Sequence, residues 1–190
     1  MIDLILNYFQ NSTTITIAVL VVLSLYLISI FWVFIYKNFS LNEIISIEKD
    51  SLESLLYGSS IPSNNSVLKK CLNNTKPTKE ILEACQNSTI KDATNGLSWL
   101  SIVASTSPFI GLFGTVIGIL ESFAQFATKT KVSFSVIAPV ISEALVATAG
   151  GIFVAIFAYT FHQILNRKCY ELSVYLKTQS DLIISKKTPY

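Results

Sequence analysis

The stretch that decides the fold is Ile15–Tyr36, ITIAVLVVLSLYLISIFWVFIY, which carries no charged side chain from end to end. An α-helix rises about 1.5 Å per residue, so about 20 apolar residues cross the hydrocarbon core of a bilayer. Two further runs are comparably apolar. Ala93–Thr128 carries one charge, Glu121, and Val132–Asn166 carries one, Glu143. Both exceed spanning length, so each is predicted to project beyond the bilayer.

The composition agrees with a membrane protein. The chain has 190 residues, of which 51% are hydrophobic and 14% are charged, and its mean hydropathy is +0.54. A soluble domain of this size is rarely so apolar. The runs are too long for strands and lack their period, so the predicted fold is an all-α membrane protein with three transmembrane helices. The first run lacks the basic start and small-residue cleavage site of a signal peptide, so it is expected to be retained.

The lysines and arginines predict the topology. Of the 14 basic residues, all except Lys129 and Lys131 lie in residues 37–97 or in the tail after residue 166. Because basic segments mark the cytoplasmic side, the N-terminus is predicted outside and the C-terminus inside. The predicted segments are an outer lead (1–14), helix one (15–36), a cytoplasmic helical insert (37–97), helix two (98–128), an outer hairpin (129–132), helix three (133–166) and a cytoplasmic helical tail (167–190).

Inside the insert, helices are predicted over Leu41–Tyr57, over Val67–Asn73, and after Thr78, a possible N-cap. From about Ile90 the chain is expected to be helical without a break to Thr128, with a kink at Pro108. The charged residues of the insert balance, as on a solvated helical surface.

The three cysteines are expected to be free structural thiols. Cys71, Cys85 and Cys169 all fall on the predicted cytoplasmic side, where thiols stay reduced. No C-x-x-C pair occurs, so no metal and no cofactor are predicted. The sequence contains no basic patch with interleaved aromatic residues, so nucleic-acid binding is not predicted. It contains no visible nucleophile–base pair, so an enzyme is not predicted.

Two faces of small residues stand out in the second and third runs. In SPFIGLFGTVIG (107–118) and the residues after it, helical spacing aligns one such face; in ISEALVATAGGIF (141–153) and beyond it aligns another. Small residues let helices approach closely in lipid, and one copy cannot bury all of this surface, so the chain is expected to oligomerise or recruit another membrane helix. The first face holds Gly111, Thr115, Gly118 and Ser122 with Gly114 beside it; the second holds Ala144, Thr148, Gly151, Ala155 and Ala158.

Glu143 is the candidate functional carboxylate. An ionisable group in a spanning segment is costly, so it is expected to face protein or water. Together with Thr115 and Thr148 it fits a polar, ion-accessible path between helices, and it fits a structural carboxylate bonded across a subunit interface equally well. Glu121 is expected to be interfacial and wet, and His162 to be an interfacial anchor.

Residues Ser107–Ile119 closely resemble the second-helix signature of the TolQ/ExbB branch of the MotA/TolQ/ExbB proton-channel family, and Ala138–Ala149 resembles its third-helix signature. The resemblance covers roughly residues 97–166. It implies a homopentameric ring in the bacterial inner membrane around two copies of a single-span partner, TolR- or ExbD-like, whose essential aspartate is protonated to drive rotation. By motif position, Thr115 and Thr148 would line the ring interior facing that aspartate, and Glu143 would be the family's third-helix glutamate.

The resemblance also implies a client. A TolQ-like subunit serves outer-membrane integrity and cell division through TolA and Pal, whereas an ExbB-like subunit energises uptake through TonB. The short outer lead favours the TolQ-like role, with the ExbB-like role as the alternative. Departures from the family pattern are Glu121, Gly150 and Phe157. A MotA-like flagellar stator is disfavoured because the insert is short and only three spans are predicted, and a passive membrane scaffold is the remaining alternative.

Overall fold

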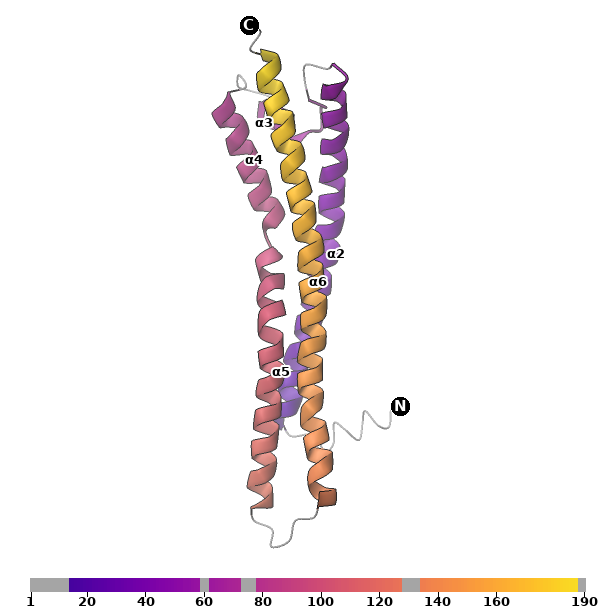
Figure 1. Ribbon diagram of the computed structural model, residues 1–190, viewed down its shortest axis with the longest axis vertical. Helices are drawn as coiled ribbons and strands as arrows, with labels where there is room; N and C mark the ends of the chain where they lie inside the picture. The colour runs from indigo at the N-terminus through magenta and orange to yellow at the C-terminus, as the bar shows by residue number, and fades with distance from the viewer. Residues whose placement is uncertain (1–13, 59–61, 73–77, 128–133, 188–190) are drawn as a thin grey trace. The chain divides into compact units, whose positions relative to one another are not determined.

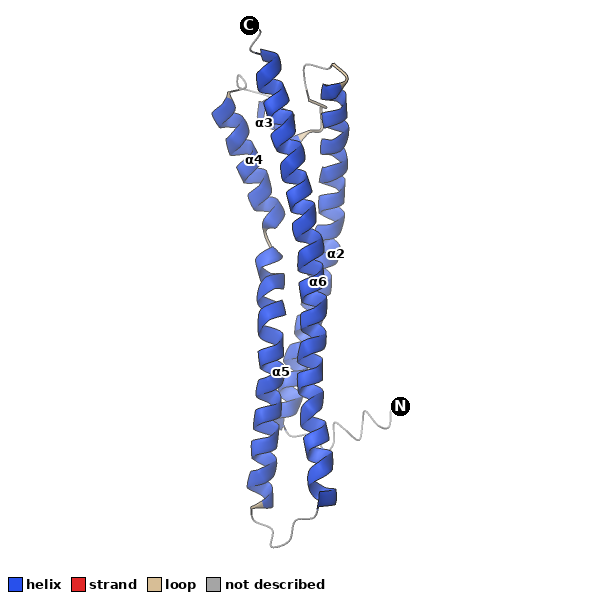
Figure 2. Cartoon of the chain, in the orientation of Figure 1, coloured by secondary structure: helices blue, strands red, loops and turns tan. Residues whose placement is uncertain are grey.

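The structure, a computed structural model, describes residues 14–58, 62–72, 78–127 and 134–187. Within these ranges every regular element is a helix and there is no strand (Figure 2). The expected outer lead, apart from Thr14, and the expected hairpin lie outside the described residues. The helices are α2 (Thr14–Leu56), α3 (Val67–Leu72), α4 (Lys79–Thr94), α5 (Leu97–Phe126) and α6 (Phe134–Lys187) (Figure 1).

The predicted fold class is confirmed. Three helical stretches within the described residues are long and apolar enough to cross a membrane. The helix expected over Leu41–Tyr57 is not separate, because α2 continues unbroken from the first span to Leu56. Likewise, α6 joins the third span and the tail in one helix. The side of the membrane on which each end lies stays a prediction.

The chain divides into two compact units. The first, here called the membrane unit, comprises Met1–Trp32 and Trp99–Phe161. The second, here called the insert unit, comprises Val33–Ser98 and His162–Tyr190. The apolar halves of α2, α5 and α6 make up the described part of the membrane unit, and α3, α4 and the polar halves of α2 and α6 make up that of the insert unit.

In the membrane unit, α5 and α6 run antiparallel with their backbones in contact. Gly111 lies against Thr148 and Gly151, and Gly118 lies against Ala144. A methyl group added at Gly151 would lie 2.5 Å from the carbonyl oxygen of Ser107. Only residues without a Cβ allow such an approach, and it brings the hydroxyls described below within reach of each other.

Helix α2 packs on this pair through apolar side chains. Val19 lies beside Gly114, and Leu23 lies beside Gly150. Farther along α2, the ring of Phe31 meets that of Phe161 edge-on, with centroids 5.0 Å apart. The side chains of this core are therefore drawn from all three helices of the membrane unit.

One expectation about the insert unit is wrong: the helix from Ile90 to Thr128 is broken. It divides at Asn95-Gly96, where Gly96 has φ of +90°. This left-handed conformation suits glycine and commonly ends a helix. The Lys37 ammonium donates to the carbonyl of Asp92 at 2.8 Å, which satisfies an acceptor that the end of α4 leaves without a helical partner.

Two smaller expectations differ from the structure. Thr78 precedes α4, but its side chain makes no capping hydrogen bond. The charged residues of the insert do not all lie on a solvated surface, because Glu48 is fully buried. Its carboxylate accepts hydrogen bonds from the Ser66 hydroxyl at 3.0 Å and from the Val67 N–H at 2.7 Å. It also accepts one from the Gln179 amide at 2.9 Å.

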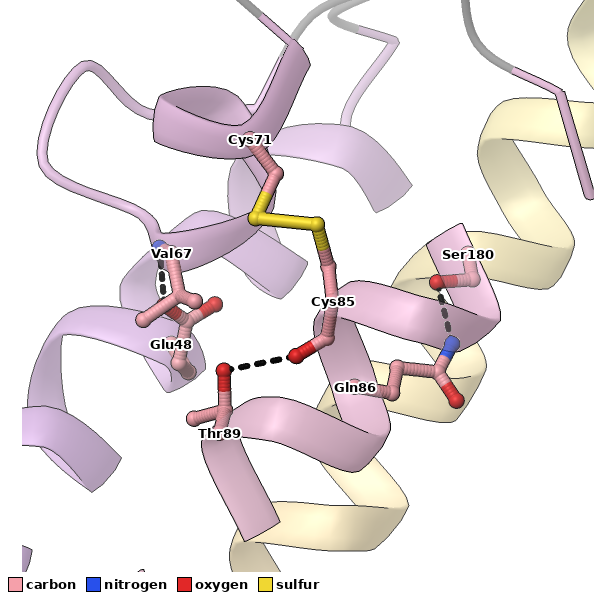
Figure 3. Close-up of a disulfide and its surroundings, with 7 residues drawn as sticks. All are labelled: Glu48, Val67, Cys71, Cys85, Gln86, Thr89 and Ser180. Atoms are coloured by element: carbon pink, nitrogen blue, oxygen red, sulfur yellow. Dashed lines mark hydrogen bonds between the residues drawn. A yellow bond between two sulfur atoms is a disulfide. The ribbon is translucent and has the colours of Figure 1, made fainter. Parts of the chain in front are cut away.

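The expectation of free thiols is wrong for two of the three cysteines. Cys71 in α3 and Cys85 in α4 form a disulfide (Figure 3), whereas Cys169 is free and buried. Because α3 packs on α4, the two Cα atoms lie 6.4 Å apart, a separation that a disulfide spans. This pair could not be predicted from the sequence, because a separation of 14 residues belongs to no recognised cysteine motif.

Candidate functional site

The two threonines singled out from the sequence meet between α5 and α6. The Thr148 hydroxyl lies 3.3 Å from the Thr115 hydroxyl and 3.3 Å from the carbonyl oxygen of Gly111. Thr115 donates its own proton to the Leu112 carbonyl at 2.6 Å, one turn back on α5. Because that bond uses the only proton of Thr115, its oxygen is left to accept from Thr148.

The direction of these hydrogen bonds shows which further hydrogen bond the threonine pair can make. The single Thr148 proton points toward α5, where it has two acceptors. The Thr148 oxygen can therefore still accept a hydrogen bond through its lone pairs. Thr115 is only 6% exposed, whereas Thr148 is half-buried. The pair can therefore accept a hydrogen bond at Thr148 from a donor outside the α5–α6 contact.

Further hydroxyls follow the same face of α5. Ser107 and Ser122 are buried at helical spacing on either side of Gly111 and Thr115. Ser122 donates to the carbonyl of Gly118 at 2.7 Å, and the buried Ser107 oxygen has no hydrogen-bond partner in the described ranges. The face predicted from small residues is thus also a line of hydroxyl groups.

Glu143 lies on α6, as Thr148 does. Five residues separate it from Thr148, which turns the two side chains about 140° apart around α6. Helical spacing groups Glu143 with Ala147 and Gly150, and a methyl group at Gly150 would meet Leu23 of α2 at 3.6 Å. Glu143 is half-buried, and its role beside the two threonines stays a prediction.

The expected packing residues are only partly on the buried line of α6. Ala144 and Gly151 are buried, but Ala155 is half-buried. Ala147 and Val154 take part instead and were missed. An i, i+3, i+4 spacing counted from Ala144 would have included both residues, whereas the predicted face took only one residue from each turn. On α5, Gly111, Gly114 and Gly118 are all buried.

The remaining titratable residues lie away from the threonine pair. Glu121 is half-buried, and its Oε2 is buried without a hydrogen-bond partner within the described residues. His162 is half-buried at the start of the insert unit's part of α6. The part of the chain that the structure describes contains no group of three His, Cys, Asp or Glu residues placed to hold a metal ion.

This arrangement can position a proton but cannot titrate one. A threonine hydroxyl neither ionises near neutral pH nor carries a charge, so Thr115 and Thr148 can only orient a donor or a water molecule. A titrating group that uses the pair has to be a carboxylate or imidazole brought close to Thr148.

Comparison with known proteins points the same way. The sequence pattern of the MotA/TolQ/ExbB proton channel family matches residues 62–178. A biopolymer transport protein of Helicobacter pylori strain 26695, named ExbB-like 1, is 47% identical over 98% of this chain and 100% of its own length. The Tol-Pal system protein TolQ of Haemophilus influenzae is 42% identical over 43% of this chain and 36% of its own.

ExbB proteins also match part of the chain. The biopolymer transport protein ExbB of Neisseria gonorrhoeae is 46% identical over 38% of this chain and 33% of its own length. Proteins of this kind reside in the bacterial inner membrane, and the three membrane-length helical stretches fit that location. The chain therefore belongs to the MotA/TolQ/ExbB proton channel family, in its TolQ/ExbB branch.

Proposed function

We propose that this chain is the ring-forming subunit of a proton-motive-force-driven motor of the inner membrane. The observation that carries the proposal is the Thr115–Thr148 hydroxyl pair, held between two otherwise apolar helices of a proton-channel family member. The motor acts with a TolR- or ExbD-like single-span partner, whose aspartate supplies the titrating group that the pair lacks.

The pair would act on that aspartate in its protonated form. A protonated carboxyl is a hydrogen-bond donor, and the open capacity of Thr148 is that of an acceptor. A carboxylate ion would have to compete with the Gly111 carbonyl and the Thr115 oxygen for the single Thr148 proton. The pair would thus hold the neutral partner helix in place and release it when the proton leaves.

Glu143 would serve the same path from the other flank of α6. A half-buried carboxylate on a spanning helix stays only where protein or water solvates it. Its place beside α2 suits a proton or water entry between α2 and α6 within one subunit, separate from the contact with the partner.

A ring of several copies is supported by the outward surface of α5. Its face opposite the glycines carries large apolar side chains, among them Phe109, 71% exposed, and Phe113, 59% exposed. Such a face is satisfied by lipid or by a neighbouring copy in the membrane. We propose a homopentamer, with the N-terminus in the periplasm and the insert and tail in the cytoplasm.

The client can be proposed from the relatives. The protein named ExbB-like matches the whole chain, so we propose an ExbB-like role, energising TonB-dependent uptake across the outer membrane. A TolQ-like role in envelope integrity and cell division is the second candidate. It is favoured by the local match to TolQ.

The test is a hydroxyl series in a strain whose own gene is deleted. Thr148→Val keeps the shape and removes the hydroxyl, and we expect it to abolish uptake of iron–siderophore or envelope integrity at normal abundance. Thr148→Ser restores an oxygen and should retain part of the activity. Thr115→Val should be milder than Thr148→Val, because Thr148 keeps the Gly111 carbonyl as acceptor.

Glu143→Ala is the companion variant on the other flank, and we expect normal abundance and normal partner binding with activity lost. Wild-type activity from Thr148→Val, Thr115→Val and Glu143→Ala together would leave the scaffold alternative as the better account. If Thr148→Val lowers the amount of protein in the membrane fraction, the test rests on the activity of Thr148→Ser, which leaves the packing almost unchanged.

A further inference from the structure

Helix α3 is a short element of the insert unit that is held at both ends. It has six residues, Val67–Leu72, too few to be stable alone. Near its C-terminal end, Cys71 is bonded to Cys85 of α4 (Figure 3). In its middle, Leu68 is fully buried. What keeps α3 in place is therefore outside α3.

The N-terminal end of α3 is held by a buried polar network. Glu48 of α2 accepts from Ser66 and Val67 and in turn accepts from Gln179 of α6, whose amide also donates to the Glu48 carbonyl at 2.8 Å. Gln179 accepts from the Ser51 hydroxyl at 3.1 Å. The first turn of α3 is thus fixed to α2 and α6 independently of the cysteines.

Helix α4 has its own link to α6. Gln86, the residue after Cys85, donates to the Ser180 hydroxyl (Figure 3). It also donates to the Leu176 carbonyl. The disulfide therefore ties together two elements that are each already anchored, α3 through Glu48 and α4 through Gln86. It closes a covalent loop of the chain between Cys71 and Cys85.

A permanent disulfide does not suit the compartment. The proposed orientation places the insert unit in the cytoplasm, where low-molecular-weight thiols keep cysteines reduced. Both Cys71 and Cys85 are half-buried, so small reagents can reach them. We propose that Cys71 and Cys85 are a reversible redox site, whose oxidation locks α3 onto α4 and whose reduction loosens it. This rests on the orientation in the proposed function, and on no other part of it.

The chemistry is thiol–disulfide exchange with a low-molecular-weight disulfide. The thiolate of one cysteine attacks a sulfur of the reagent, forms a mixed disulfide and expels one thiolate, which takes a proton. The second cysteine, as its thiolate, then attacks the bonded sulfur of the first and expels the other reagent thiolate. Two protein thiols are oxidised and the reagent is reduced by two electrons to two thiols. A small dithiol reverses the reaction.

The first experiment reads the redox state in cells. Cys169→Ser serves as the background, since it removes the buried free cysteine and leaves a count of two or no reactive thiols. Cells are quenched with acid and the thiols are tagged with a maleimide-polyethylene glycol. We expect two tags per chain in unstressed cells, none after exposure to diamide, and two again after recovery.

The second experiment reads the lock itself on the full chain in nanodiscs, poised with oxidised glutathione or with dithiothreitol. Amide hydrogen exchange in Val67–Leu72 should be on the order of tenfold slower in the oxidised state, while exchange in α5 is unchanged. Cys71→Ser should give the fast rate under both conditions, and Cys169→Ser should behave as wild type.

Three results would overturn the proposal: no tags in unstressed cells, which makes the bond permanent; two tags after diamide, which means that the pair never forms; or equal exchange of α3 in the two states. Each is independent of the motor assignment, which depends on Thr148→Val. Wild-type activity from Thr148→Val, Thr115→Val and Glu143→Ala, together with the expected redox cycle, would count against the proposed function alone.

Discussion

Among single residues, the glycines of the membrane unit differ in how much room they leave. A methyl group at Gly151 would lie 2.5 Å from the Ser107 carbonyl oxygen, which is backbone and cannot rotate away. A methyl group at Gly118 would lie 3.4 Å from the Thr16 hydroxyl and 3.5 Å from the Ala144 methyl, ordinary contacts. Two glycines of one sequence pattern thus have different structural costs.

We therefore expect Gly151→Ala to destabilise the subunit by about 1–3 kcal/mol, since α5 and α6 must move apart. Gly118→Ala is the matched control and should fall within about 0.5 kcal/mol of wild type. The measurement is thermal unfolding of the detergent-solubilised protein by fluorescence-detected size exclusion. Equal melting temperatures for the two variants would contradict the α5–α6 contact described above.

The sequence predicted which residues share a face but not what covers that face. Helical periodicity grouped Gly111, Thr115 and Gly118, and their burial follows from that grouping. It could not show that α5 and α6 of one subunit cover each other, because a face of small residues fits a neighbouring copy equally well. For the same reason Glu143 seemed close to Thr148, although the turn of the helix separates them.

At the scale of elements, the Glu48 carboxylate links helices of the insert unit, which the composition of the sequence did not indicate. Glu48 looked like one charge among several on a solvated surface, yet it joins α2, α3 and α6 from a fully buried position. The acceptors and donors that it satisfies come from residues far away in sequence, so no local pattern could reveal it. The disulfide escaped prediction for the same reason.

Glu48→Ala should lower stability by about 1–3 kcal/mol, because it leaves the Ser66 hydroxyl and the Val67 N–H without their acceptor. Glu53→Ala, on an exposed position of the same helix, is the control and should change stability by less than about 0.5 kcal/mol. Chemical denaturation of the reduced protein, followed by circular dichroism, checks both. The network would be unimportant if the two variants unfolded at one denaturant concentration.

At the scale of the whole molecule, the orientation in the membrane decides which compartment the insert unit faces. It rests on the lysine bias, and native Cys71 and Cys85 cannot report it, since the redox state of the pair decides whether they react, whichever side they face. In a cysteine-free background, we expect cysteine at Asn11 or Thr130 to react with an impermeant maleimide in intact cells. Cysteine at Tyr57, which is 91% exposed, should react only after lysis. Labelling at position 57 in intact cells would reverse the orientation.

The central claim is that this chain conducts protons together with a partner helix and that the Thr148 hydroxyl takes part. The most direct measurement is proton flux into liposomes that hold the chain co-purified with its single-span partner, followed with an internal pH dye under an imposed potassium potential. We predict flux for the wild type, little for Thr148→Val, partial flux for Thr148→Ser, and none when the partner's aspartate is replaced by asparagine. Equal flux from wild-type, Thr148→Val and protein-free liposomes would contradict the account.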